Sequence, residues 1–433
     1  MVRSISTFDT EVETALLVGV QHGTQPEWDV RDHLDELSLL CKTAGARVDA
    51  RVICRVGRIH PATYIGRGKA EEIADRVRAD QIATVVFDDD LSPAQGRNLE
   101  SILGAKVIDR TQVILHIFAQ HARTHEGRMQ VELAQLEYLL PRLRRMWTHL
   151  ERQRGGMGMH GPGEKQLELD RRRILERIDR FRTALQDVRR HRAEQRRGRR
   201  RHGWSVISLV GYTNAGKSSL LNALTGAGVL AEDKLFATLD PTTRRLALPN
   251  RRPALLTDTV GFIRKLPHGL VEAFKATLEE VAEADLLIHV VDCAHSRVDD
   301  QIRAVDAVLA EIGAADKPVL YALNKIDVPE GRAAAASLSS RLHPAVAISA
   351  LTGEGLEDLR TAIGDALRES LVQAAVRIPL SEARLLAQIR AEALVIQEEF
   401  DAEHARIEAI FSPRLWEQCS KFHNPSPQGH LVR

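Results

Sequence analysis

One eight-residue stretch limits what this chain can fold into. Residues 211–218 read G-Y-T-N-A-G-K-S, which fits the pattern G-x-x-x-x-G-K-[ST]. The apolar run at 205–210 predicts a buried strand before it, and residues 219–224 predict the first turns of a helix after it. A glycine-rich turn between a strand and a helix points successive backbone N–H groups at phosphate oxygens. The stretch therefore predicts an α/β nucleotide-binding domain.

Several residues of this stretch have a distinct chemical role. Gly211 and Gly216 allow the backbone to wrap closely around the phosphates. Lys217 is expected to reach the β- and γ-phosphates, and the Ser218 hydroxyl is expected to bind Mg²⁺. The predicted nucleotide contacts of the loop are Gly211, Tyr212, Thr213, Asn214, Ala215, Gly216, Lys217 and Ser218.

A second motif follows the apolar run at 254–257. There an aspartate can hold the metal through water, and a glycine amide can meet the γ-phosphate. The residues are Asp258, Thr259, Val260 and Gly261. The next residue is Phe262, where a Ras-like protein has a glutamine that orients the attacking water. Because a phenyl ring cannot hold water this way, we expect slow intrinsic hydrolysis that a partner accelerates.

Two later strand ends predict selection of guanine. Residues 319–323 precede an N-K-x-D motif, and 346–348 precede a short turn. A carboxylate at Asp327 can accept hydrogen bonds from guanine N1–H and its 2-amino group, and a backbone N–H of the turn can meet guanine O6. Adenine offers neither donor, and such a site can reject it by ~10⁴–10⁵-fold. The predicted residues are Asn324, Lys325, Ile326, Asp327, Ser349, Ala350 and Leu351. Four motifs in this order predict a GTP-hydrolysing switch.

The N-terminal part alternates strand and helix patterns. This alternation predicts a small parallel α/β domain. The expected strands are 15–20, 48–56, 84–87 and 106–109, and the expected helices are 29–43, 69–78 and 92–104.

Two features of this part admit two interpretations each. Gly66 and Gly68 indicate a turn that starts a helix, with a phosphate site as the alternative. Residues 88–90, all aspartates, indicate a solvated strand end beside a helix N-terminus, with a metal site as the alternative.

A basic helical hairpin is expected next. Helical patterns at 111–147 and 164–195 flank the glycine-rich residues 155–163, which are expected to be non-helical. Residues 142–201 hold twenty Lys/Arg against eight Asp/Glu in a chain of net charge +1. Such a face attracts polyanions, and RNA is favoured because no duplex-reading motif is visible. The alternatives are a solvated coiled-coil surface or a basic linker at 196–201.

Histidines in this region allow a further hypothesis. His116, His121 and His125 are expected in one helix, the last two at i and i+4. They lack the H-E-x-x-H order of a zinc site, so a metal role has little support.

Composition limits the protein class. At 433 residues and 44% hydrophobic content, the chain can hold two to four domains. Cys41, Cys54, Cys293 and Cys419 have no metal-ligand spacing and are expected to be reduced thiols. The start has no apolar signal segment, and no run reaches the ~18 residues of a membrane span. We expect a cytoplasmic protein, monomeric and without stable membrane insertion.

At this point the sequence resembles the HflX family of ribosome-associated GTPases. Besides the nucleotide motifs, the resemblance rests on residues 64–69, 87–95, 107–111, 130–136 and 161–164. It implies that the N-terminal part and the hairpin dock on the 50S subunit, with the glycine-rich tip near ribosomal RNA. It further implies binding to 70S ribosomes and the splitting of stalled or idle ones, with GTP favouring engagement and hydrolysis favouring release.

The first switch loop is expected at 233–243, because this segment follows the first helix of the nucleotide-binding domain, and the resemblance assigns its key residue. Its F-A-T-L-D pattern covers Phe236, Ala237, Thr238, Leu239 and Asp240. Thr238 is thereby implied to complete the Mg²⁺ shell with Ser218, whereas spacing alone leaves Thr242 and Thr243 equally competent. The implied catalytic residues are Lys217, Thr238 and Gly261, which act by positioning and electrostatics on GTP, with GDP as product.

Four domains are expected in an α/β chain. These are an N-terminal parallel α/β domain at 1–125, the hairpin at 126–203, a doubly wound P-loop GTPase domain at 204–370, and a small α+β appendage at 371–433. Other candidate functions are a GTPase of ribosome assembly, RNA modification or membranes, a P-loop ATPase or kinase, and an RNA-binding module with a vestigial site. The sequence leaves open which ribosomal state is the substrate and whether the N-terminal domain binds a second nucleotide.

Overall fold

The computed structural model describes residues 13–143, 162–201, 204–226, 235–249, 253–265, 275–369, 372–411 and 413–423. The chain divides into two units. The first comprises residues 1–186, 232–240 and 265–275, and the second comprises 187–231, 241–264 and 276–433. Two short segments from the middle of the chain thus belong with the N-terminal part. The boundaries expected at 125, 203 and 370 remain predictions.

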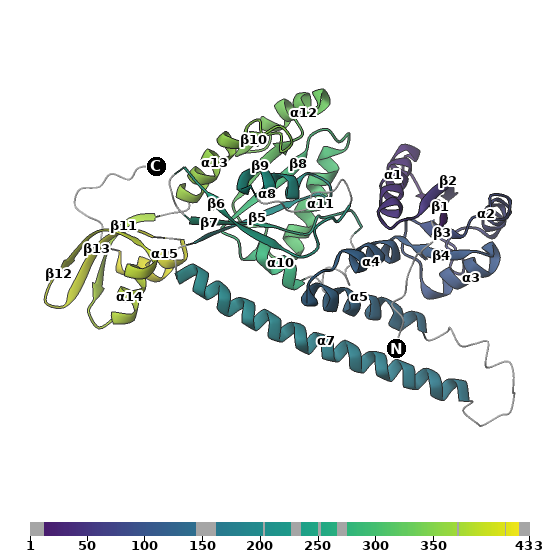
Figure 1. Ribbon diagram of the computed structural model, residues 1–433, viewed down its shortest axis with the longest axis horizontal. Coiled ribbons are helices and arrows are strands. Elements are labelled where there is room, and N and C mark those ends of the chain that lie inside the picture. The colour runs from purple at the N-terminus through teal and green to yellow at the C-terminus, as the bar shows by residue number, and fades with distance from the viewer. Residues whose placement is uncertain are drawn as a thin grey trace. The chain divides into compact units, whose positions relative to one another are not determined.

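A four-stranded parallel sheet organises the first unit (Figure 1). Its strand order is β2-β1-β3-β4. The strands are β1 Thr14–His22, β2 Arg47–Val56, β3 Thr84–Phe87 and β4 Lys106–Asp109, and the helices between them are α1 Glu27–Thr43, α2 Arg67–Ala79 and α3 Pro93–Leu103. Ser92 and Gln95 form a capping box at the start of α3, and Gly104 ends that helix in a left-handed conformation. The predicted parallel α/β domain is confirmed.

Gly66 precedes the first residue of α2 with an extended backbone. The interpretation of this glycine pair as a turn that starts a helix is therefore confirmed.

The helical stretch after β4 is broken, contrary to prediction. Helix α4, Arg110–His121, ends at Ala122, whose ψ of 105° is not helical. Helix α5, His125–Leu143, starts after Thr124, whose hydroxyl accepts the Gly127 N–H at 2.9 Å. The expectation that three histidines share one helix is wrong, because His121 and His125 lie in different helices. Among the described residues, no group of three His, Cys, Asp or Glu side chains is arranged to hold a metal.

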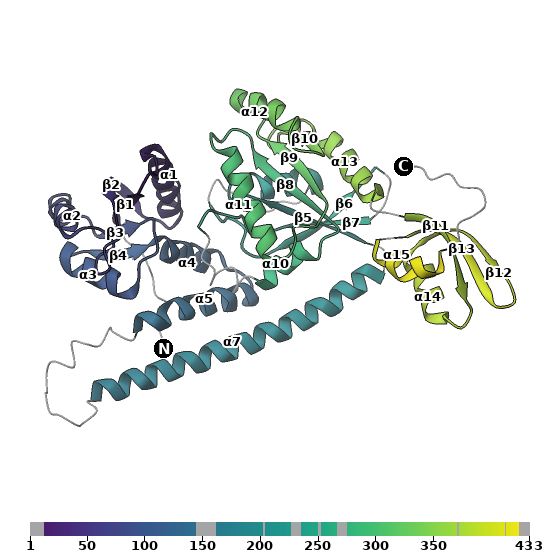
Figure 2. The same ribbon diagram turned by 180° about the vertical axis from the view of Figure 1, so that it is seen from behind.

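The second arm of the hairpin is one long helix. Helix α7, Pro162–Arg201, is longer than predicted at both ends. The basic residues 196–201 are helical, and so are Pro162 and Gly163, which were expected in the non-helical tip; residues 155–161 lie outside the described ranges. Figures 1 and 2 show α5 alongside the first part of α7, and Arg182 donates to Glu137 at 2.7 Å. Ile178 and Leu185 form the buried stripe of α7.

The first of the aspartates after β3 is buried and not solvated. Asp88 is 2% exposed, and Arg110 donates to it at 2.9 Å and Lys265 at 2.7 Å. Arg110 also donates to Glu36 at 2.5 Å. Although burial raises it, the pKa of Asp88 lies below its usual range because these cations favour the charged form. The solvated interpretation was wrong for Asp88, because residues distant in sequence neutralise its carboxylate, whereas Asp90 is exposed as predicted.

A six-stranded sheet organises the second unit. Its order is β10-β9-β8-β5-β7-β6, and only β6 runs antiparallel to its neighbour. The strands are β5 Ser205–Gly211, β6 Thr242–Ala247, β7 Pro253–Asp258, β8 Leu286–Asp292, β9 Val319–Asn324 and β10 Ala345–Ala347. The helices are α8 Lys217–Thr225, α10 Lys275–Ala282, α11 Val298–Glu311, α12 Pro329–Ser339 and α13 Leu356–Glu369.

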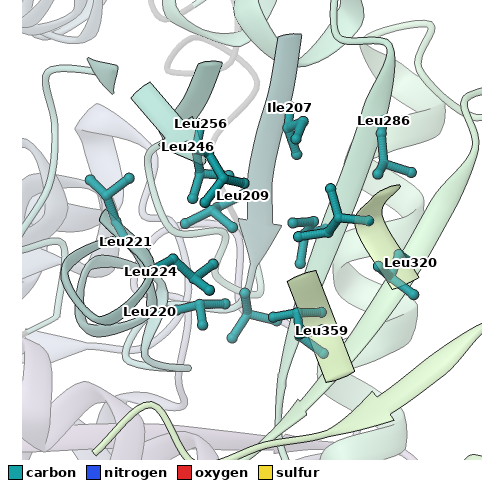
Figure 3. Close-up of a cluster of buried hydrophobic side chains, with 14 of the residues drawn as sticks. Ile207, Leu209, Leu220, Leu221, Leu224, Leu246, Leu256, Leu286, Leu320 and Leu359 are labelled. Atoms are coloured by element: carbon teal, nitrogen blue, oxygen red, sulfur yellow. The ribbon is translucent and has the colours of Figure 1, made fainter. Parts of the chain in front are cut away.

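Leucine and isoleucine side chains fill the space beside this sheet (Figure 3). Ile207 and Leu256 come from neighbouring strands, Leu220 comes from α8, and Leu359 comes from α13. All four are buried. Packing of this kind fixes the carboxyl ends of the strands, from which the nucleotide motifs emerge.

The C-terminal residues form an antiparallel sheet of order β11-β13-β12, covered by helices on one face. Its elements are β11 Val372–Pro379, α14 Ala383–Glu392, β12 Leu394–Phe400, β13 His404–Phe411, α15 Pro413–Cys419 and the 3₁₀ turn Ser420–Phe422. Ile407 and Phe411 on β13 are buried against Ile389 and Leu415. The predicted α+β appendage is confirmed, and β12 and β13 form an antiparallel hairpin within it. All four cysteines of the chain are free and buried.

Replacing Arg110 by leucine should destabilise the first unit by about 3–5 kcal/mol, because Asp88 and Glu36 each lose their buried guanidinium partner, although Lys265 still pairs with Asp88. Arg31→Leu is the matched control: its side chain is exposed and pairs with Glu27, so its loss should cost below about 1 kcal/mol. Differential scanning calorimetry of both full-length variants measures the difference. Equal stabilities would contradict the buried network.

Candidate nucleotide site

The phosphate loop at 211–218 joins β5 to α8. Gly211 has φ +148°, and a Cβ on it would lie 2.4 Å from the carbonyl oxygen of Val290 on β8. Gly216 has φ +96°, and a Cβ there would lie 2.3 Å from the side-chain nitrogen of Asn324. Both glycines are therefore required by close approach as well as by backbone conformation. The structure places them where the sequence pattern predicted.

Lys217 lies under this loop. Its Nζ donates to the carbonyl oxygens of Gly211 at 3.2 Å and Tyr212 at 2.9 Å. Burial lowers the pKa of the ammonium to about 8, and the charge of Asp258 opposes this shift. A buried cation beside the loop is suited to meet the phosphates of a nucleotide.

The oxygen atoms beside Lys217 fit a magnesium ion. Ser218 Oγ donates to Asp258 Oδ2 at 2.6 Å, and Asp258 is fully buried. Hydroxyl and carboxylate oxygens are the ligands that Mg²⁺ takes in nucleotide sites. Thr238, the other predicted ligand, lies in segment 235–240 of the first unit.

The loop after β7 is interlocked with the phosphate loop. The Phe262 N–H donates to Gly211 O at 3.1 Å, and the Thr213 N–H donates to Phe262 O at 2.7 Å. Phe262 is 1% exposed. A Cβ on Gly261 would lie 3.0 Å from Lys217 Nζ, so a side chain there would fill the space beside the ammonium. The predicted γ-phosphate-sensing loop is thus next to Lys217, and its aromatic residue is buried.

Tyr212 adds a contact that the sequence did not suggest. Its hydroxyl accepts the backbone N–H of Arg264 at 2.9 Å. Thr259, predicted in the same motif, donates its hydroxyl to Leu209 O at 2.6 Å. Both bonds tie the segment 258–264 to β5 and its loop.

The guanine-selecting motifs also meet at the carboxyl edge of the sheet. Asn324 donates to Ala215 O at 2.8 Å and accepts the Ala350 N–H at 2.9 Å. Ser349 donates its hydroxyl to Asp327 at 2.6 Å. Leu351 is exposed at 84%. Three loops far apart in sequence are thereby brought together.

Asp292 was missed by the sequence analysis. It ends β8 and accepts from Lys325 Nζ at 2.6 Å, and Lys325 has a left-handed backbone with φ +69°. The signal was present as a carboxylate at the end of an apolar run. The ion pair holds the lysine of the N-K-x-D motif in place.

Family models match most of the chain. The model described as GTP-binding GTPase N-terminal matches residues 31–119, GTP-binding GTPase Middle Region matches 121–199, and 50S ribosome-binding GTPase matches 206–325. The GTPase HflX of Lacrimispora saccharolytica is 48% identical over 404 residues, which cover 93% of this chain and 95% of that protein. The chain belongs to the HflX family of GTPases. The HflX proteins of Magnetococcus marinus (50% identity, 84% of each chain) and Escherichia coli (48% identity, 86% of this chain and 87% of that protein) agree.

A solved structure is also similar. A GTP-binding protein of Sulfolobus solfataricus in complex with GDP is 27% identical, with a TM-score of 0.42, over 82% of this chain and 98% of that protein.

HflX-family membership confirms the resemblance found in the sequence and makes this chain a GTPase that binds and hydrolyses GTP. The alternatives of an ATPase, a small-molecule kinase and a vestigial site are thereby excluded. In the described residues, no helix is long and apolar enough to cross a membrane.

Nucleotide binding should take up a proton above pH 8. Lys217 has a pKa of about 8 in the nucleotide-free protein, and phosphates favour its charged form, so binding raises that pKa. Affinity for GDP should therefore fall by up to tenfold per pH unit above pH 8. Calorimetric titration in buffers of different ionisation enthalpy measures the uptake, which Lys217→Met should abolish. Affinity independent of pH from 8 to 9.5 would contradict it.

Proposed function

We propose that this protein is a GTP-controlled switch that binds the 50S subunit and 70S ribosomes and splits stalled or idle ribosomes. One observation carries the proposal: the arginine-covered helix α7 ends at Arg201, three residues before the strand that leads into the phosphate loop. The same chain thus joins a polyanion-binding arm directly to a nucleotide site.

The exposed face of α7 fits RNA. Arg172, Arg173 and Arg190 are 76%, 74% and 78% exposed, while the opposite stripe at Ile178 and Leu185 is buried. Among the described residues, they pair with acidic residues one turn away on the same helix, and such pairs are weak in water. Phosphates can therefore compete for these guanidinium groups. A family model described as 50S ribosome-binding GTPase supports ribosomal RNA as the polyanion.

The proposed roles at the nucleotide are those that the sequence motifs predict. Lys217 contacts the β- and γ-phosphates, and the Gly261 N–H meets the γ-phosphate. Ser218 and Thr238 would hold Mg²⁺, with Asp258 behind Ser218; the ion would neutralise charge on the phosphates. Asp327 binds the guanine edge, and the turn at 349–351 supplies an N–H to O6.

Hydrolysis by the isolated protein is slow in this proposal. Phe262 is buried and its backbone N–H and C=O are both bonded to the phosphate loop, so this residue does not orient water. A ribosomal partner that positions the water or adds positive charge would accelerate the reaction by ~10³–10⁵-fold. The protein works in the cytoplasm as a monomer.

Replacing Asp327 by asparagine should weaken GTP binding by about 10²–10⁴-fold, since two hydrogen bonds to a charged acceptor are lost. ATP binding should not change. Asp299→Asn is the control, because this exposed carboxylate pairs with Arg341 outside the site. Fluorescent-nucleotide titration measures both. A variant that keeps its GTP preference would refute the assignment of the base site.

Sedimentation with 50S subunits tests the whole proposal. Binding should be strong with a non-hydrolysable GTP analogue and weak with GDP. The triple change of Arg172, Arg173 and Arg190 to glutamine should weaken binding and flatten its salt dependence, because each lost phosphate contact lowers the slope by ~0.7–0.9.

The matched control changes three arginines of the first unit that are equally exposed and equally paired within one helix. These are Arg31, Arg67 and Arg78. Equal binding by both triple variants, or identical binding with either nucleotide, would overturn the proposal.

A further inference from the structure

The segment 235–240 is held on the first unit at both of its ends. At one end, Phe236 is 2% exposed and meets Phe118 of α4 edge to face, with ring centroids 4.7 Å apart. Phe236 has φ +58°, a left-handed conformation that is unfavourable for a bulky side chain. Such a conformation persists only where the surroundings fix it. Burial against Phe118 supplies that constraint.

At the other end, Asp240 binds the start of α5. Its Oδ2 accepts the backbone N–H groups of Arg123 at 3.0 Å and Thr124 at 2.9 Å, and its Oδ1 accepts the Thr124 hydroxyl. That hydroxyl in turn accepts the Gly127 N–H at 2.9 Å. A helix N-terminus carries unpaired N–H groups and a positive dipole end, so a carboxylate is stabilised there.

The contact between Asp240 and the start of α5 is possible because Gly127 has no side chain. A Cβ on Gly127 would lie 2.4 Å from Asp240 Oδ1, closer than any side chain permits. Its φ is not in the left-handed region, so the backbone itself would accept alanine. The glycine therefore makes room for Asp240 and is not required by the helix. Alanine at this position would exclude Asp240 without altering the GTPase motifs.

The loop that follows Gly261 has an anchor of its own on the same unit. Lys265 donates to Asp88 and to Asp89, both at 2.7 Å. Burial lowers and the two carboxylates raise the pKa of Lys265, and the net shift is upward, so it remains charged. Lys265, like the segment 235–240, is thus held by residues of the first unit.

We propose that Asp240 is a positioning residue that makes the protein prefer GTP over GDP. The inference rests on the proposed function, because Thr238 is assigned there as a metal ligand. Thr238 lies two residues from each anchor, Phe236 and Asp240. Fixing both flanks removes conformational freedom from the segment before the nucleotide arrives, so ordering Thr238 at the metal costs less. Binding of GDP does not require Thr238 to be ordered at the metal, so the two anchors do not raise the affinity for GDP.

Linkage makes the effect reciprocal. If docking of Asp240 favours GTP, then GTP favours docking of Asp240 by the same factor. The first turn of α5, the helix that leads into the basic hairpin, is therefore held more firmly in the GTP state. Hydrogen exchange at the N–H groups of Arg123, Thr124 and Gly127 should be slower with the GTP analogue than with GDP.

Gly127→Ala provides the test. With Mg²⁺ present, it should lower affinity for a fluorescent non-hydrolysable GTP analogue by about tenfold and leave GDP affinity within twofold of the parent. Gly96→Ala is the control, since Gly96 lies in the first turn of α3 and has nothing within 4 Å of its Cβ position. In an Asp240→Ala background, Gly127→Ala should have no further effect.

The outcomes separate this inference from the proposed function. An unchanged or raised preference for GTP in Gly127→Ala, with a folded protein by calorimetry, overturns the role of Asp240. If Thr238→Ala alone leaves GTP affinity unchanged, the metal assignment fails instead. A tenfold loss in Gly127→Ala that persists in the Asp240→Ala background also overturns the inference, because the glycine would then act through another contact.

Discussion

The nucleotide site depends on one buried amide. Asn324 donates to the phosphate loop at Ala215 and accepts from the guanine-side turn at Ala350. Both groups of the side chain are satisfied, so its burial is favourable, whereas loss of either bond would leave a polar atom desolvated. The close contact with Gly216 shows that the loop is packed against this amide. Asn324 thus connects the phosphate loop to the turn at 349–351.

Much of this arrangement could be predicted from the sequence, because the patterns that indicate it lie within short stretches of the chain. Parallel strands buried on both faces appear as short apolar runs, and nucleotide motifs follow them at the carboxyl edge. The N-terminal strands and the helix expected at 92–104 could be predicted for the same reason. Lys217 and Asp327 therefore lie in the loops where their motifs put them.

The errors came from partners that are distant in sequence. The apolar pattern continues through Ala122, and no glycine or proline marks the break, yet the chain leaves the helix there. The new helix starts at Thr124, beside the carboxylate of Asp240, which follows 116 residues later. The sequence predicts a solvated carboxylate at Asp88, whereas the structure pairs it with Arg110 and Lys265. Helix capping and charge pairing by residues distant in the sequence produce no periodic pattern, so they could not be predicted from the sequence.

The buried position of Phe262 has a consequence for the design of the switch. Its main chain is bonded on both sides to the phosphate loop, at Gly211 and Thr213, so the backbone at this position is fixed whatever side chain it carries. A glutamine introduced here would enter the pocket that the phenyl ring occupies and would face packed atoms. Restoring the Ras-like residue alone would therefore not restore Ras-like chemistry. In the proposed function, the bonded main chain at Phe262 is therefore the reason why hydrolysis depends on a partner.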